Sequence, residues 1–368
     1  MSIFYLFLAI MIFVSLIAYY NFLTAPRLKK RTLNVNKEEL PFISILIPAR
    51  NEEDGISKCL ASIIHQNYPN YEVIVCDDNS DDKTADIIKK YMRRSDKLKM
   101  ISGKPLPDDW TGKNWACQQL GLEAKGDQFL FLDADVTLRP ETLTSALALM
   151  QKKDVQMLSC FPRQKLGGLG EWLVVPLIDW LTLSFIPFDL VYRLKTTHFS
   201  VAIGQFILIK KETYLEMGRH KAIRKIVVED MEMAKKVKEL GHKILPCKST
   251  GLVECRMYSG LRESVNGMAR STYNGASIRP VIYVLYLLGL FTLFVVPFIL
   301  AFFNIIYIFV YVPLIFQRAL SSVLSRQNVI VNLILFPAHI IFFIIVAFYS
   351  LHITLGKKIV WKGRRIKF

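Results

Sequence analysis

The fold is decided by the stretch Gln128-Phe129-Leu130-Phe131-Leu132-Asp133-Ala134-Asp135-Val136. Four consecutive apolar residues lead into two carboxylates that stand one residue apart. A continuous apolar run of this length is typical of a strand buried on both faces of a parallel sheet. Ligands bind such sheets just beyond the carboxyl ends of the strands. We therefore expect Asp133 and Asp135 to lie where the chemistry takes place.

A divalent metal is the first interpretation of this acidic pair. Two clustered carboxylates repel each other unless a cation lies between them. Mg²⁺ and Mn²⁺ prefer oxygen ligands and connect protein carboxylates to substrate phosphates. Asp133 and Asp135 therefore predict a metal that holds a diphosphate. The alternative is an acidic turn after a strand, with Asp135 near the N-cap of a helix.

The sequence around this stretch predicts an α/β domain between Pro41 and Gly251. The expected strands cover residues 42–47, 71–76, 99–102, 128–132 and 206–209. The expected helices cover residues 57–66, 84–94, 115–124 and 227–240. This alternation favours a mostly parallel sheet with helices on both faces. No G-x-G-x-x-G or P-loop pattern stands at a strand end, which argues against dinucleotide-binding and ATPase domains.

Composition indicates a membrane protein rather than a nucleic-acid-binding one. The 368 residues are 52% hydrophobic, the apolar excess is concentrated at the two ends, and the formal net charge is +16. A basic chain with apolar ends suits an anionic membrane surface and anionic substrates. The six cysteines form no C-x-x-C pair, so we expect free thiols in a reducing cytosol rather than a zinc or redox site.

Residues 1–24 are predicted to form an N-terminal transmembrane helix. Ser2 to Leu23 carries no charged side chain and is long enough to cross roughly 30 Å of hydrocarbon. A cleaved signal peptide is the alternative, but no small-x-small cleavage site follows. The basic residues directly after the run place the following domain in the cytoplasm by the positive-inside rule. They are Arg27, Lys29, Lys30 and Arg31.

The C-terminal region, residues 281–355, contains two long apolar runs. Residues 356–368 form a basic tail that should be cytoplasmic, which requires an even number of crossings. We therefore expect two spans, at roughly 281–303 and 329–355, joined by an apolar segment. Three crossings are the alternative.

The cytosolic domain is expected to cover residues 25–280, with a membrane-interface segment at 171–192. This segment is apolar and contains two tryptophans, which suit a membrane interface. It also contains Asp179, which a spanning helix would bury at a cost of about 2.5 to 3.5 kcal/mol. A buried core helix is the alternative.

A second acidic motif, Asp77-Asp78-Asn79-Ser80-Asp81-Asp82, follows the predicted strand 71–76. The carboxyl ends of parallel strands lie along one edge, so this motif and Asp133/Asp135 can share a pocket. One cluster would accept hydrogen bonds from a base or a ribose, and the other would hold a diphosphate through a metal. Together they predict a nucleotide-diphosphate site, although the second motif alone also suits an ordinary capped helix start.

Three further motifs are candidates for the same pocket. Lys113, after Gly112, is placed to contact a phosphate oxygen, or is a solvated loop lysine. Gly204-Gln205-Phe206 precedes a strand and forms either a loop over an acceptor or a simple turn. Asp230 is the candidate general base for an acceptor hydroxyl, with a positioning role if the acceptor is an ionised carboxylic acid. Helix capping is the alternative for Asp230.

These motifs resemble those of family 2 glycosyltransferases. In the family's order they are Pro48-Ala49-Arg50-Asn51-Glu52, Asp77-Asp78-Asn79-Ser80, Gly112-Lys113, Asp133-Ala134-Asp135 and Glu229-Asp230, within residues 41–255. The resemblance implies a Rossmann-like GT-A fold, a UDP-sugar donor, Mg²⁺ or Mn²⁺, and inversion at the anomeric carbon.

The resemblance also assigns roles to individual residues. It implies that Asp77 and Asp78 contact the uridine and that Lys113 contacts the diphosphate. It makes Asp133 and Asp135 the donor and metal motif and Asp230 the catalytic base. Pro48, Arg50 and Glu52 are expected to complete the nucleotide-sugar pocket.

A narrower likeness is to the bacterial carotenoid- and hopanoid-associated branch of this family. It is carried by Trp110 to Cys117, by Arg256-Met257-Tyr258 and by Trp361-Lys362-Gly363-Arg364. The Q-x-x-R-W motif of processive synthases is absent from the corresponding region, residues 262–274. The likeness implies a single transfer of a hexose, glucose, to a membrane-embedded lipid-like acceptor such as a carotenoid acid or related terpenoid.

Two other functions stay open at this point. One is transfer of a sugar to a polyprenyl phosphate or a glycolipid, and the other is a non-catalytic membrane scaffold with the same fold. In the leading interpretation the protein is a multi-pass cell-membrane enzyme with a cytoplasmic catalytic domain. Its partners are the donor, a lipid-like acceptor and the membrane, and not nucleic acid.

Overall fold

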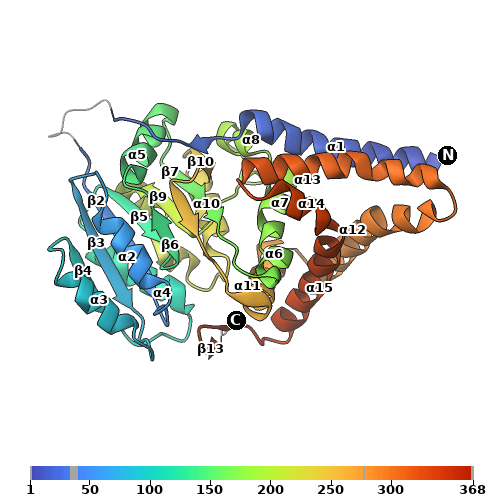
Figure 1. Ribbon diagram of the computed structural model, residues 1–368. Helices are drawn as coiled ribbons and strands as arrows, with labels where there is room; N and C mark the ends of the chain where they lie inside the picture. Colours follow the sequence, from blue (N-terminus) through green and yellow to red (C-terminus); the bar gives the residue numbers. More distant parts are fainter. Residues whose placement is uncertain (1, 34–39, 277, 366–368) are drawn as a thin grey trace. The chain divides into compact units, whose positions relative to one another are not determined.

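The computed structural model of the protein describes residues 2–33, 40–276 and 278–365. The chain divides into two compact units (Figure 1). The α/β unit consists of Pro26–Lys165, Phe188–Met257 and Val360–Phe368, and the helical unit of Met1–Ala25, Leu166–Pro187 and Tyr258–Ile359. The expected cytosolic domain at 25–280 stays a prediction, and part of the basic tail, residues 366–368, lies outside the described residues.

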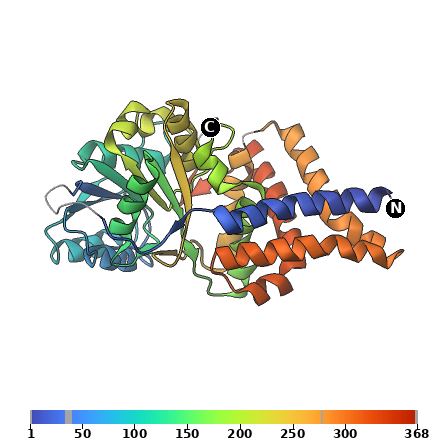
Figure 2. The ribbon, with the colours of Figure 1, turned by 90° about the horizontal axis from the view of Figure 1, so that it is seen from above.

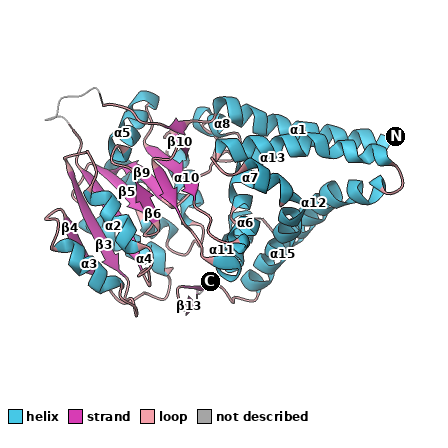
Figure 3. Ribbon diagram, in the orientation of Figure 1, coloured by secondary structure: helices cyan, strands magenta, loops and turns pink. Residues whose placement is uncertain are grey.

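Within the described residues, the α/β unit is built on an eight-stranded sheet in the order β1-β10-β7-β9-β5-β2-β3-β4 (Figure 3). The strands are β1 (Arg27–Leu28), β2 (Ile43–Ala49), β3 (Tyr71–Asp77), β4 (Leu98–Ser102), β5 (Gln128–Leu132), β7 (Met157–Phe161), β9 (Phe206–Lys210) and β10 (Ile244–Ser249). β9 runs antiparallel to its neighbours β5 and β7, and the other described pairings in this sheet are parallel. The mostly parallel sheet expected from the sequence is confirmed.

Helices cover both faces of this sheet because side chains alternate along each strand. Leu130 and Leu132 of β5 belong to an apolar core that also contains Ile56 of α2 and Leu143 of α5. Phe131 points to the opposite face and packs against Tyr214 of α9, with ring centroids 5.2 Å apart. The helices of this unit are α2 (Ile56–Ile64), α3 (Thr84–Met92), α4 (Gly112–Glu123), α5 (Thr142–Lys153), α8 (Phe188–Arg193), α9 (Lys211–Glu216), η2 (His220–Ile223) and α10 (Glu229–Glu239).

Two smaller sheets lie in the same unit. The described part of the chain forms a three-stranded sheet of β6 (Val136–Leu138), β11 (Val253–Cys255) and β8 (Arg163–Gln164). Because Val136 pairs with Cys255, this sheet fixes the backbone directly after Asp135. A hairpin of β12 (Val360–Trp361) and β13 (Arg364–Arg365) also belongs to the α/β unit.

The helical unit contains long apolar helices. Its helices are α1 (Ser2–Thr24), α6 (Leu169–Val174), α7 (Pro176–Phe185), α11 (Gly260–Ala276), α12 (Pro280–Ala301), η3 (Ile305–Val310), α13 (Tyr311–Leu324), α14 (Val329–Ile334) and α15 (Phe336–Leu355). α1 lies along α13, as Figure 2 shows, and also packs against α7. Asn21 of α1 donates two hydrogen bonds to carbonyls at the end of α7, of Leu183 and Ile186, at 2.7 and 2.8 Å. These bonds satisfy carbonyls that a helix end leaves without an intrahelical partner.

Four helices in the described ranges are long and apolar enough to cross a membrane, at Ser2–Thr24, Pro280–Ala301, Ile305–Leu324 and Phe336–Leu355. The sequence predicted the first of these and two C-terminal spans. The segment expected to link those two is itself helical, which adds Ile305–Leu324 as a candidate. The expected span 329–355 is divided at Leu335, because Pro337 lacks an N–H group and starts a new helix there. The number of crossings therefore stays a prediction.

The segment predicted to lie in the membrane interface, residues 171–192, forms parts of α6, α7 and α8. The Trp180 side chain of α7 is fully buried, and Asp179 is 4% exposed. One oxygen of Asp179 accepts a hydrogen bond of 2.9 Å from Gln327, which offsets part of the cost of burying the acid. The assignment to a membrane interface stays a prediction.

Candidate functional site

The residues predicted to share a pocket lie along one edge of the large sheet. β5, β2 and β3 are neighbours and run in parallel, so their carboxyl ends meet at that edge. Asp133 and Asp135 follow β5, Pro48 lies near the end of β2, and Asp77 and Asp78 stand at the end of β3. The sheet thus gathers segments that are far apart in the sequence.

The segment Gly204-Gln205-Phe206 reaches the same edge because β9 is antiparallel. Phe206, the first residue of β9, pairs with Leu132, the last residue of β5. The Asp133 N–H donates to the Gln205 carbonyl at 3.3 Å. The side chains of Gln205 and Phe206 are buried, Phe206 in the apolar core. Their role as an acceptor loop stays a prediction, and the backbone of Gly204 is the part of this segment nearest to the acidic residues.

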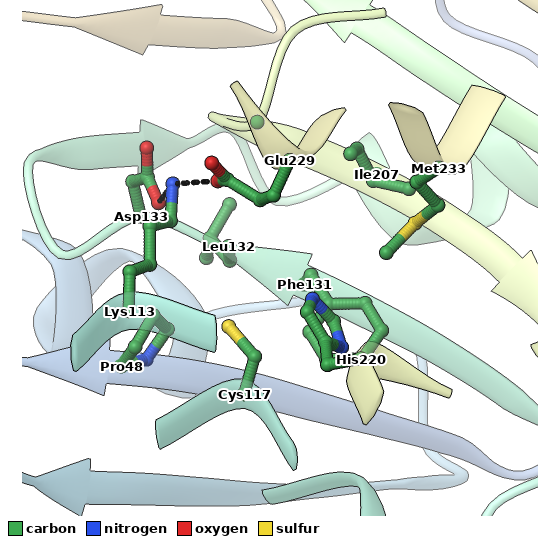
Figure 4. A pocket seen from close by; sticks show the side chains of 11 residues that line it. Pro48, Lys113, Cys117, Phe131, Leu132, Asp133, Ile207, His220, Glu229 and Met233 are labelled. Atoms are coloured by element: carbon green, nitrogen blue, oxygen red, sulfur yellow. Dashed lines mark ion pairs between the residues drawn. The ribbon is translucent and has the colours of Figure 1, made fainter. Parts of the chain in front are cut away.

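Lys113 joins two carboxylates from different elements at this edge (Figure 4). Its Nζ lies 2.9 Å from Asp133 Oδ1 and 2.8 Å from Glu229 Oε1. Burial lowers the pKa of Lys113, but Asp133 and Glu229 outweigh burial and hold that pKa well above its ordinary value. Burial raises the pKa of Glu229, but Lys113 brings that pKa below its usual range. The three groups therefore form a charged cluster, with a positive Lys113 at its centre.

Gly204 and Asp230 lie directly beside this cluster. A Cβ added to Gly204 would lie 3.0 Å from Lys113 Nζ and 3.3 Å from Glu229 Oε1, so a glycine allows the backbone to come this close. Asp230 accepts hydrogen bonds from the N–H groups of Gly204 at 2.7 Å and Met231 at 2.8 Å. Burial and the neighbouring Glu229 raise the pKa of Asp230 to about 7. Asp230 is thus a fixed carboxylate that changes charge near neutral pH.

Asp135 fits the metal that the sequence predicted. Its Oδ1 is buried and has no hydrogen-bond partner. Burial raises the pKa of Asp135 to about 8 together with the negative charges of Asp133 and Glu52, because all three disfavour the ionised carboxylate. No group of three or more His, Cys, Asp or Glu within the described residues could hold a metal ion. Asp133 and Asp135 would supply the protein ligands. Substrate phosphates and water would supply the remaining ligands, as is common for Mg²⁺ sites.

Arg50, Asp77 and Asp78 shape the turn after β3. The Arg50 Nη1 donates to the carbonyls of Asp78 at 2.5 Å and Asn79 at 2.6 Å. Asp77 Oδ1 accepts from the Ser80 N–H at 3.3 Å, which closes the turn. Arg50 and Asp77 thus hold this loop, and direct contact of either with a donor stays a prediction. The Asp78 side chain is only 2% exposed.

A small pocket lies beside the charged cluster (Figure 4). It is lined by Pro48, Lys113, Cys117, Phe131, Leu132, Asp133, Gly204, Ile207, His220, Glu229 and Met233. Sequence reasoning assigned Pro48, Lys113, Asp133 and Gly204 to the site and missed the other residues, of which Glu229 and His220 are polar. Glu229 was noted only as the neighbour of Asp230, and its place in the same helix turn was the available signal. His220 gave no signal as a lone histidine; it bonds to the Tyr214 hydroxyl at 2.8 Å, and burial lowers its pKa to about 3, so it is neutral.

Comparison with known proteins finds a family that part of the chain resembles. Residues 44–218 match the family model described as Glycosyl transferase family 2. A probable glycosyltransferase of Bacillus subtilis, YdaM, is 30% identical over 212 residues, which are 57% of this chain and 49% of that protein. The 4,4'-diaponeurosporenoate glycosyltransferase of Staphylococcus aureus is 30% identical over 256 residues, 68% of this chain and 65% of that protein. The chain thus spans about half to two thirds of the length of these curated relatives.

One solved structure resembles the whole chain. It is the mannosyltransferase PcManGT from Pyrobaculum calidifontis in complex with GDP-Man and Mn²⁺, with a TM-score of 0.57 and 16% sequence identity. The similarity covers 99% of both chains. At this identity the likeness concerns the fold alone. With the family match, it confirms the expected GT-A fold and its mostly parallel α/β sheet.

Replacing Lys113 by methionine should destabilise the protein. Lys113→Met leaves two partly buried carboxylates without their shared cation, which should cost on the order of 3 kcal/mol of unfolding free energy. Lys236→Met is the matched control, because its pair with Glu239 is exposed, at 35% and 38% of the two side chains, and should be worth roughly 0 to 1 kcal/mol. Denaturation of the purified protein in detergent measures both losses. Equal losses would contradict the central place of Lys113.

Proposed function

We propose that the protein transfers a hexose, glucose, from a UDP-sugar to a lipid-like acceptor, because residues 44–218 match the model of glycosyl transferase family 2. The reaction inverts the anomeric carbon, and the acceptor is a carotenoid acid or related terpenoid from the bilayer. One observation carries the proposal: at a single sheet edge, Lys113 lies between Asp133 and Glu229. Asp135 and Asp230 lie at the same edge, and so do Asp77 and Asp78, the two acids that we assign to the nucleoside.

The donor pocket follows from the order of groups along the edge. Asp77 and Asp78 stand at the end of β3, on the nucleoside side, and Asp133 and Asp135 follow β5. Asp133 and Asp135 would hold Mg²⁺ or Mn²⁺, which supplies positive charge that stabilises the departing diphosphate. The buried and unpaired Oδ1 of Asp135 supports this assignment.

Lys113 contributes a permanent positive charge at the leaving group. Its pKa lies well above the ordinary value because Asp133 and Glu229 outweigh the effect of burial, so the side chain stays protonated throughout catalysis. A cation fixed by two carboxylates needs no rearrangement when negative charge develops on the diphosphate. Such preorganised charge is an effective way to lower a transition-state barrier.

Asp230 is the candidate general base. It is fixed by two backbone N–H groups beside Gly204, and a pKa of about 7 suits a base that works near neutral pH. With a hydroxyl acceptor, the carboxylate takes the proton as the acceptor oxygen attacks the sugar carbon. With a carboxylic acid acceptor that proton has already left, and Asp230 positions the acceptor.

A lipid-like acceptor is supported by the apolar helices and by one relative. Four helices among the described residues have the length and composition of membrane spans, and the relative from Staphylococcus aureus is named for 4,4'-diaponeurosporenoate. The basic residues Arg27 to Arg31 directly after α1 favour a cytoplasmic catalytic domain. We therefore propose a multi-pass cell-membrane enzyme that does not act on nucleic acid.

Release of UDP tests the assigned metal ligand. Purified protein in lipid nanodiscs, with UDP-glucose, a membrane lipid extract and Mg²⁺ or Mn²⁺, should release UDP, and chelation should stop the release. Asp135→Ala should lower the rate by more than the roughly 10- to 100-fold that loss of an outer-sphere partner costs. Asp86→Ala, an exposed acid on α3, should leave the rate unchanged. Equal rates for Asp135→Ala and wild type would remove the role given to Asp135.

Asp230→Asn tests the base and distinguishes the acceptor classes. On a hydroxyl acceptor the wild-type rate should rise with pH through a midpoint of about 7, because Asp230 is protonated below that pH and ionised above it. The asparagine variant should lose this rise and about 100- to 10,000-fold in rate. On a carboxylic acid acceptor the loss should be smaller. An unchanged rate on a hydroxyl acceptor would rule out Asp230 as the base.

A further inference from the structure

The C-terminal hairpin, Val360 to Arg365, packs on the same sheet edge as the candidate donor pocket. Its two strands pair Trp361 with Arg364 and are joined by Lys362-Gly363, both with positive φ of 45° and 79°. A lysine rarely adopts this backbone conformation, so contacts of the hairpin must offset a local conformational cost. The hairpin and the sheet edge belong to the same compact unit.

Arg364 contacts an acid assigned to the nucleoside side of the pocket. Its Nη1 lies 2.5 Å from Asp78 Oδ2, and its Nη2 donates to the Asp78 carbonyl at 3.3 Å. The guanidinium thus binds both the side chain and the backbone of one residue that lies 286 positions earlier in the chain. A two-point contact of this kind fixes the orientation of the carboxylate as well as its charge.

Lys362 ties the hairpin to the loop after β2. Its Nζ lies 3.0 Å from Glu52 Oε1 and donates to the Asn51 carbonyl at 3.0 Å. Arg50 Nε donates to the Lys362 carbonyl at 3.1 Å. The hairpin therefore contacts both loops that the sequence assigned to the nucleotide-sugar pocket.

The hairpin also reaches the start of α4, where Lys113 follows Gly112. A Cβ added to Gly112 would lie 3.3 Å from the Trp361 ring, 3.4 Å from Asp78 Oδ2 and 3.5 Å from Arg364 Nη1. Gly112 therefore lies against the Asp78–Arg364 pair. The hairpin therefore lies beside the start of α4, the segment that carries Lys113.

The two carboxylate oxygens of Asp78 differ in their contacts. Arg364 occupies Oδ2, whereas Oδ1 is buried and has no hydrogen-bond partner. A buried carboxylate oxygen without a donor is costly, and a purely structural pair would be expected to satisfy both oxygens. An acceptor oxygen held in this way suits an N–H or O–H donor from a bound nucleoside.

Three groups around Asp78 act on its charge. Arg364 of β13, Arg50 of the loop after β2 and the side chain of the neighbouring Asn79 all favour the ionised carboxylate. Burial raises the pKa of Asp78 above its ordinary value, and Arg364 followed by Arg50 opposes that rise. Removing Arg364 therefore leaves burial less opposed and favours the protonated acid, which presents a poorer acceptor.

We propose that Arg364 is a positioning residue for a nucleoside-diphosphate donor, orienting Asp78 so that its Oδ1 accepts a hydrogen bond from the nucleoside. The C-terminal hairpin is then a wall of the donor pocket. This inference rests on the proposed function and adds to it a residue that lies beyond the family-model match at residues 44–218.

The test measures binding of UDP and of GDP to the full-length protein in detergent, by calorimetry at pH 6 and pH 8, together with kcat and donor KM. Arg364→Ala should weaken binding about 10- to 100-fold, as loss of a charge-assisted contact predicts. The loss should be larger at pH 6 than at pH 8. The variant should raise donor KM with little change in kcat. Arg365→Ala, an exposed arginine of the same strand, is the matched control and should bind like wild type.

Arg364→Lys keeps the positive charge but loses the planar, two-point hydrogen bonding of the guanidinium. Compared with Arg364→Ala, it should therefore regain part of the nucleotide affinity and of the wild-type pH dependence. It also carries the test if Arg364→Ala fails to fold. Nucleotide affinity in Arg364→Lys and Arg364→Ala equal to that of wild type at both pH values would overturn the inference and leave the proposed function intact. A wild-type protein that binds neither UDP nor GDP would instead contradict the proposed function itself.

Discussion

The site depends on one ion-paired lysine. Lys113 enters from the start of α4 and lies within 3 Å of a carboxylate from the end of β5 and of another from the start of α10. Without it, Asp133 and Glu229 would be two partly buried like charges in one small space, which is costly. The same contact orders the neighbouring groups, because Gly204 lies against Lys113 and donates its N–H to Asp230. The charged cluster thus connects the proposed donor side of the edge to the proposed acceptor side.

The sheet explains why these residues can meet. Parallel β5, β2 and β3 bring their acidic ends to one edge, and antiparallel β9 enters from that edge and delivers Gly204 next to Asp133. The hairpin at the C-terminus adds Arg364 and Lys362 to the same edge. The acidic groups at this edge are therefore matched by basic groups from three distant parts of the chain, Arg50, Lys113 and the C-terminal hairpin. This matching keeps a dense cluster of carboxylates compatible with folding.

Local patterns predicted much of this arrangement. The apolar run at 128–132 predicted β5 to the residue, and alternation of strands and helices predicted the mostly parallel sheet. The contacts that complete the site could not be predicted in this way, because they join residues that are far apart in the sequence. Nothing in the neighbourhood of Arg364 indicates a partner at Asp78, 286 residues away, and the sequence does not show that Glu229 pairs with Lys113. The helix at 311–324 was also missed, because apolar composition alone does not show where a membrane region breaks.

We propose that the residues at this sheet edge transfer a hexose from a nucleotide sugar to a lipid of the bilayer. Mass spectrometry of membrane lipids from cells with and without the gene tests this proposal most directly. The account predicts a lipid heavier than its precursor by one hexose, present only in cells that carry the gene. The unglycosylated precursor should accumulate in cells that lack it. Identical lipid profiles in the two strains would contradict the account.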